Sequence, residues 1–141
     1  MYEPQNFERL LGTAGVSDQM LKNHFTLYPG YVKNFNTLDT TLMAMEKEGK
    51  FGGPEYAELN RRLGWEFNGM HLHELYFGNM IKISSATLND IPLSQKLAAE
   101  WGSLELWQKD FCSMGAMRGI GWVILYHDST AKRLFNVWIN E

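Results

Sequence analysis

Two long stretches of the chain carry apolar residues at intervals of three and four, the spacing of amphipathic helices. The first begins after Ser17, which can cap a helix, and ends near residue 48. The second begins at Pro54, a favoured residue in a first helical turn, and ends near Met80. A short loop joins them, so the pattern predicts an antiparallel helical hairpin. We expect Pro29 to kink or split the first helix, because it removes one backbone hydrogen bond.

Shorter elements follow the polar segment SSATLNDIP. We expect a helix at residues 95–101, capped by Ser94, and a second helix at residues 104–114, capped by Ser103. The β-branched and aromatic residues at 122–126 and 133–139 predict two antiparallel strands joined by a short turn. Because two strands alone are marginal in water, we expect a third strand or a covering layer.

These elements predict an α+β fold, with an N-terminal antiparallel helical hairpin followed by helices and an antiparallel sheet. The change of pattern predicts a helical hairpin domain at residues 1–85. Residues 86–141 are then the front part of an α+β domain.

The composition is that of a soluble globular protein, with 45% hydrophobic and 21% charged residues. A net charge of −3 argues against a nucleic-acid partner, and no apolar run reaches the roughly 18 residues that a membrane span needs. We expect no signal peptide, and the lone Cys112 fits a reducing cytoplasm. Five Trp and eight Met indicate either a large aromatic core or an apolar wall around a buried metal.

Histidine positions offer the first chemical signal. His71 and His73 are two residues apart, so on a helix they point about 200° away from each other and cannot bind one metal. His73 lies on the apolar face of the second predicted helix. A single histidine on such a face is more often a packed core residue than a metal ligand. His127 falls in the predicted turn and should be exposed. In an antiparallel hairpin, however, His24 lies at the level of His73.

Two imidazoles buried opposite each other in a hairpin would cost free energy if they were charged and had no partner. As neutral side chains they can bind a metal ion. If both bind one metal, the ring nitrogens of His24 and His73 should lie about 3–4 Å apart. Two nitrogens alone do not complete a site, which needs at least three protein ligands. No other His, Cys or Asp is well placed.

Four segments in order resemble the iron/manganese superoxide dismutase family over residues 17–140: HFTLYPGYVKNFN, HELYFGNM, WGSLELWQKDF and RGIGWVIL. The resemblance implies that His24 and His73 are metal ligands and that His71 is a bystander. Tyr31 falls on the active-site tyrosine, one residue closer to the ligand than usual. Trp122 falls on the first tryptophan of the cavity wall, and Ile124 replaces the second. Tyr28 stands where the family commonly has a gateway histidine.

The resemblance implies dismutation of superoxide to dioxygen and hydrogen peroxide at a mononuclear iron or manganese site, with one ion per complete subunit. Tyr31 would guide or relay protons at the opening of the metal site, and Trp122 would form part of the wall of that site. We expect the hydroxyl of Tyr31 to point between His24 and His73, and Tyr28 to lie nearer the surface. Gly69 stands where iron-type members often carry an outer-sphere Gln. The choice between iron and manganese is therefore left open. A cytoplasmic homodimer is implied, with superoxide as substrate and no nucleic-acid or membrane partner.

One departure from the family concerns the ligands. The family takes its other two ligands, an Asp and a His, from a segment after the second strand, and this chain stops at Glu141, before that segment. We therefore expect the front portion of a longer enzyme, with weak metal binding and little dismutation in the 141 residues alone. The alternative is a non-catalytic helical protein that packs against a partner and has lost the metal site.

Overall fold

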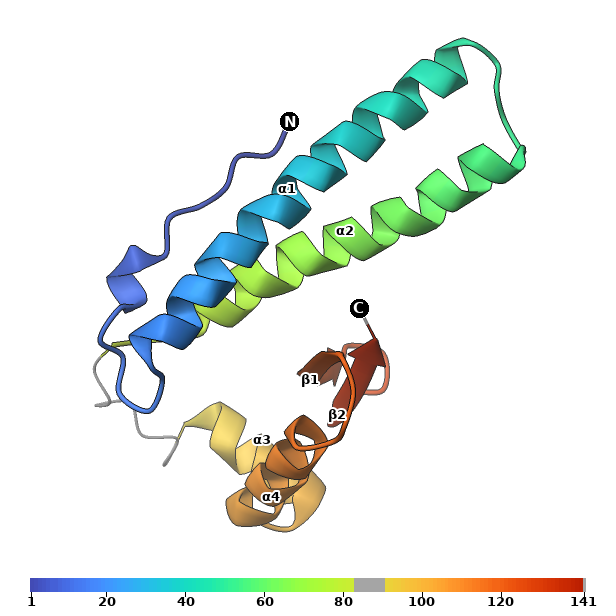
Figure 1. Ribbon diagram of the computed structural model, residues 1–141. Helices are drawn as coiled ribbons and strands as arrows, with labels where there is room; N and C mark the ends of the chain where they lie inside the picture. The colour runs from blue at the N-terminus through green and yellow to red at the C-terminus, as the bar shows by residue number, and fades with distance from the viewer. Residues whose placement is uncertain (83–90, 141) are drawn as a thin grey trace. The chain divides into compact units, whose positions relative to one another are not determined.

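The computed structural model describes residues 1–82 and 91–140, which belong to two compact units, Met1–Ser84 and Ser85–Glu141. Figure 1 shows a helical hairpin in the first unit, and two helices with a two-stranded sheet in the second. The predicted α+β class is confirmed. The elements are η1 (Glu8–Leu10), α1 (Asp18–Lys47), α2 (Pro54–Gly78), α3 (Pro92–Trp101), α4 (Leu104–Gly115), β1 (Gly121–Asp128) and β2 (Arg133–Asn140).

Helices α1 and α2 run antiparallel and side by side in Figure 1. Ser17 caps α1, because its side chain accepts a hydrogen bond from the backbone N–H of Met20 at 3.2 Å. Pro54 begins α2, where its missing N–H would have no helical partner in any case. Both predicted starts are confirmed. Within the described residues, no helix is long and apolar enough to cross a membrane.

Pro29 lies inside α1 without splitting it, so this part of our expectation is wrong. The residues around it explain why the helix continues. Tyr28 and Val32, one turn apart, are both buried against α2 and the N-terminal segment. Packing of an apolar face supplies most helical stability in proteins, and here it outweighs the hydrogen bond that proline removes.

The core of the first unit lies between the two helices and extends under the N-terminal segment. Asn36 ties that segment to α1, since its side chain accepts from the backbone N–H of Tyr2 and donates to the carbonyl of Tyr2, both at 2.8 Å. Residues 1–10 therefore cover part of the hairpin. The buried core residues are Phe7, Leu10, Leu21, Tyr28, Val32, Met70 and Phe77.

In the second unit, α3 begins three residues before the predicted start. Pro92 occupies the first turn, and the hydroxyl of Ser94 donates back to the carbonyl of Ile91 at 2.8 Å. The predicted cap at Ser94 is therefore wrong, because proline is itself a favoured start. Ser103 caps α4 as expected, accepting from the N–H of Leu106 at 3.1 Å.

Strands β1 and β2 pair antiparallel, with Trp122 opposite Ile139. Pairing continues to Asp128, so His127 lies in β1 opposite Leu134 and not in the predicted turn, although it is exposed as expected. The side chain of Asp128 accepts from two backbone N–H groups of the loop, at 2.8 and 3.0 Å. This Asx-type turn needs few residues, which leaves more of the segment free to pair.

Helices α3 and α4 contact the sheet and provide the covering layer that two strands need. Asp110 accepts from the indole of Trp101 at 3.2 Å and from the amide of Asn136 at 2.7 Å. The oxygen of the same amide accepts from the indole of Trp107 at 3.1 Å. This polar network joins both helices to β2.

Candidate metal centre

The rings of His24 and His73 meet between α1 and α2. The Nδ1 atom of His24 lies 3.4 Å from the Nε2 atom of His73. His24 is half-buried, and His73 is only 2% exposed. The distance agrees with the approach predicted from their positions in the hairpin.

The backbone of α2 selects the tautomer of His73. Its Nδ1 atom lies 2.6 Å from the carbonyl oxygen of Gly69, one turn earlier. A carbonyl can only accept, so Nδ1 carries the proton and Nε2 presents a lone pair toward His24. A neutral imidazole oriented in this way is the form that binds metals.

The spacing of the two nitrogens fits a shared metal ion. Two ligands at about 2.1 Å from one metal, with a tetrahedral angle between them, lie about 3.4 Å apart. Imidazole nitrogen is also an accepted ligand for iron. Without a metal, the same geometry serves a hydrogen bond from His24 to His73. Among the residues that the structure describes, no group of three or more His, Cys, Asp or Glu side chains could hold a metal. Within the described residues, the candidates for metal ligands are therefore the two imidazoles of His24 and His73.

Aromatic rings surround the histidine pair. The ring of Phe77 lies 5.8 Å from that of His73 and 6.4 Å from that of His24, measured between centroids. Tyr76 lies 6.0 Å from His24, and burial raises the pKa of its phenol. Such a shell limits the access of water to the imidazoles.

Tyr31 packs beside His73, with ring centroids 5.4 Å apart and planes tilted by 33°. Its ring occupies the space over Gly69, where an added methyl group would overlap the ring carbons. Glycine at this position therefore admits Tyr31 to the histidine pair. The predicted direction of the Tyr31 hydroxyl and its role with protons stay predictions.

Tyr28 is buried, at 1% exposure, whereas Tyr31 is half-buried. Our expectation that Tyr28 lies nearer the surface is wrong. Its hydroxyl donates to Oε1 of Glu74 at 2.7 Å and accepts from the backbone N–H of Gln5 at 3.2 Å. Burial is the main cause that raises the pKa of Tyr28 to about 12, and the carboxylate of Glu74 adds to it.

Sequence reasoning missed Glu74 and Gln5 as partners of Tyr28. A signal for Glu74 was present, because Tyr28 lies one turn after His24 on α1 and Glu74 directly follows His73 on α2. If the two histidines meet, these neighbours are close as well. Nothing in the sequence indicates that Gln5 reaches the same hydroxyl.

The remaining candidates lie elsewhere. His71 is exposed, stacks on Phe67 and has its Nδ1 atom 3.9 Å from Oε2 of Glu74. Trp122 is half-buried on β1 in the second unit. Its predicted place in the wall of the site stays a prediction.

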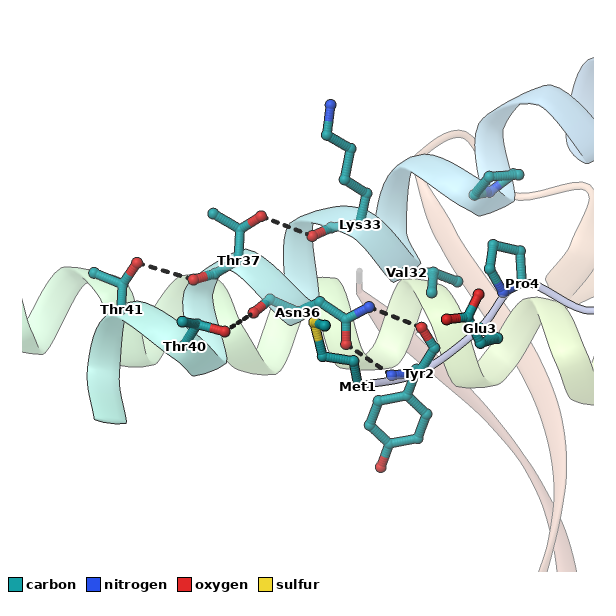
Figure 2. Close-up of a pocket in the computed structure, with 11 residues that line it drawn as sticks. Met1, Tyr2, Glu3, Pro4, Val32, Lys33, Asn36, Thr37, Thr40 and Thr41 are labelled. Atoms are coloured by element: carbon teal, nitrogen blue, oxygen red, sulfur yellow. Dashed lines mark hydrogen bonds between the residues drawn. The ribbon is translucent and has the colours of Figure 1, made fainter. Parts of the chain in front are cut away.

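A hollow of about 550 Å³ lies between the N-terminal segment and α1 (Figure 2). Neither His24 nor His73 lines it. The hydroxyls of Thr37, Thr40 and Thr41 each donate to the carbonyl four residues earlier, as the dashed lines show. These donors are thus already used within α1, and the hollow is separate from the histidine pair.

Comparison with known proteins identifies the family. The chain is 32% identical to the manganese superoxide dismutase 2 of Haloferax volcanii, over 89% of this chain and 62% of that protein. It is 31% identical to the iron superoxide dismutase of Cupriavidus metallidurans, over 91% of this chain and 64% of that protein. It is 30% identical to the manganese superoxide dismutase 1 of Haloferax mediterranei, over 79% of this chain and 75% of that protein.

A scan against models of protein families finds no match. The chain spans a little over three fifths of the length of the Haloferax volcanii relative. The similarity covers most of the chain and includes both iron and manganese enzymes, in agreement with the motifs around His24 and His73. The chain belongs to the iron/manganese superoxide dismutase family.

Proposed function

We propose that the protein acts in the dismutation of superoxide, with His24 and His73 as two ligands of an iron or manganese ion. The 3.4 Å separation of their facing nitrogens supports this proposal, because it fits two bonds to one metal. The names of the relatives support both the substrate and the choice of metals. When bound, such an ion would supply the one-electron chemistry that converts superoxide to dioxygen and hydrogen peroxide.

The protein's own residues prepare the site in four ways. The carbonyl of Gly69 holds the proton on Nδ1 of His73, so that Nε2 carries the lone pair that would bind the metal. Phe77 and Tyr28 exclude water from one side of the imidazoles. Tyr31 lies against His73, where we propose that it guides protons. Trp122 is proposed as part of the wall of the same site.

Metal content and activity test the proposal together. The protein should be purified as its own cells make it, with His24→Ala, His73→Ala or His71→Ala introduced into the gene. We expect iron or manganese in the wild type. Loss of either ligand should reduce both metal content and superoxide dismutation at least tenfold, since changes behind a ligand already cost about 10–100-fold in affinity.

His71→Ala is the matched control, because His71 is two residues from His73 on the same helix but exposed. It should retain at least half of the metal and activity. Equal losses in all three variants would contradict the proposed ligands. A wild-type protein without metal or activity would favour the alternative, a non-catalytic member that packs against a partner.

A further inference from the structure

We propose that the hydrogen bond between Tyr28 and Glu74, the Tyr28–Glu74 latch, sets the distance between His24 and His73. Tyr28 and Glu74 are then positioning residues for the candidate metal centre. The inference rests on the proposed function for its consequence, metal binding, but its geometric part concerns the protein alone.

The latch joins the two helices beside the histidine pair. Tyr28 follows His24 by one helical turn on α1, and Glu74 follows His73 by one residue on α2. The phenol of Tyr28 donates to Oε1 of Glu74 at 2.7 Å. A short bond from a buried hydroxyl to a carboxylate is among the stronger hydrogen bonds in proteins. A shift of one helix along the other would break it.

The apolar neighbours cannot define this alignment equally well. Tyr28, Phe7 and Phe77 pack as rings 4.7 to 6.3 Å apart between centroids. Apolar attraction has no direction, so such contacts tolerate small sliding movements. A hydrogen bond weakens steeply when its length or angle changes. The directional contact therefore decides where His73 stands opposite His24.

The same hydroxyl also fastens the N-terminal segment. It accepts from the backbone N–H of Gln5 at 3.2 Å, and Phe7, two residues later, is buried against Tyr28. The phenol thus joins three parts of the first unit at one point: the N-terminal segment, α1 and α2. Removing this one oxygen should loosen the attachment of these three parts to one another.

Three variants separate the hydrogen bond from ordinary packing. Tyr28→Phe removes the hydroxyl but keeps the ring. Glu74→Ala removes the acceptor, whereas Glu74→Gln keeps an acceptor oxygen in the same place. Tyr2→Phe is the control, because Tyr2 belongs to the N-terminal segment and is half exposed, outside the latch.

Two measurements on the whole chain give independent readings. The first is ¹⁵N NMR of the imidazole nitrogens without metal, which reports the tautomer and contacts of His24 and His73. The second is Mn²⁺ affinity, from the EPR signal of free Mn²⁺ during titration. Tyr28→Phe and Glu74→Ala should each shift the imidazole signals and weaken Mn²⁺ binding about tenfold. Glu74→Gln and Tyr2→Phe should stay within about twofold of the wild type, and the Tyr28→Phe/Glu74→Ala double variant should be no weaker than either single variant.

The outcomes distinguish the latch from the proposed function. If the wild type binds no Mn²⁺ but Tyr28→Phe and Glu74→Ala shift the imidazole signals, the latch stands and the proposed function fails. If the wild type binds Mn²⁺ and neither variant changes signals or affinity, the latch is wrong. Failure of Glu74→Gln to restore wild-type behaviour would also overturn it. Should Tyr28→Phe not fold, the comparison of Glu74→Ala with Glu74→Gln decides.

Discussion

Single atoms decide which side chains reach the histidine pair. Gly69 contributes in two ways: its carbonyl orients His73, and its missing side chain admits the ring of Tyr31. The sequence marks Gly69 only through its place in the family pattern. Its contact with Tyr31 comes from the facing helix, at a separation in sequence that no local pattern reports.

Replacing Gly69 with alanine tests this contact. The new methyl group would overlap the Tyr31 ring, so the ring must move away from His73. Overpacking of this kind costs about 1–3 kcal/mol, and we expect that loss in the free energy of unfolding measured with urea. NMR contacts between Tyr31 and His73 should weaken at the same time.

Gly64→Ala is the matched control, because Gly64 lies on the same helix with nothing within 4 Å of an added methyl group. Alanine is favoured over glycine in helices, so this variant should gain about 0.5–1 kcal/mol. A neutral Gly69→Ala variant would show that Tyr31 is not held against Gly69 in solution.

At the scale of elements, polar contacts join α1 to α2 at separate levels of the hairpin. Besides the Tyr28–Glu74 latch, the buried carboxylate of Glu66 accepts from Asn34 of α1 at 3.2 Å and from Arg62 of α2 at 2.7 Å. Glu66 is 1% exposed, and burying a polar group is costly unless it has hydrogen-bond partners such as these. These contacts align two helices that the apolar pattern only brings together.

The neighbouring arginines of α2 allow a paired test of that contact. Arg62→Met leaves buried Glu66 with one fewer donor and replaces the guanidinium that lies over the Trp65 ring with an apolar side chain. Because the Arg62 side chain is half exposed and water can replace it, we expect a loss of about 1 kcal/mol in unfolding free energy. Arg61→Met removes an exposed pair with Glu58 and should change stability by less than about 0.5 kcal/mol. Equal effects in urea titrations would contradict a special role for Glu66.

At the scale of the whole molecule, the contacts described above between His24, His73, Gly69, Tyr31 and Tyr76 lie within the unit Met1–Ser84. The histidine pair should therefore form without the second unit. The predicted division into domains at residues 1–85 and 86–141 stays a prediction.

A fragment of residues 1–84 tests this claim. We expect it to keep the helical circular dichroism of the hairpin and the NMR contact between His24 and His73, because its core is internal. The fragment 86–141 should be less stable, since its described sheet has two strands. Loss of the histidine contact in the first fragment would mean that the second unit is needed to hold α1 against α2.

The sequence by itself determined the elements and most of their ends. Apolar spacing predicts the hairpin and the strands, and Ser17, Pro54 and Ser103 mark helix starts, because capping depends on residues close in sequence. It also determined that His24 and His73 meet. In an antiparallel hairpin, the number of residues between each position and the connecting loop predicts which residues of the two helices lie opposite each other. The resemblance to family motifs is the basis for proposing that both are metal ligands.

Only the tertiary structure decided the surroundings of the pair. Pro29 leaves α1 unbroken, and Tyr28 turns inward to Glu74 and Gln5, against our expectations. In both cases contacts from distant segments outweigh a local tendency. Burial and hydrogen-bond partners depend on which side chain arrives from the opposite element, and that information is not carried by the spacing of residues along one helix.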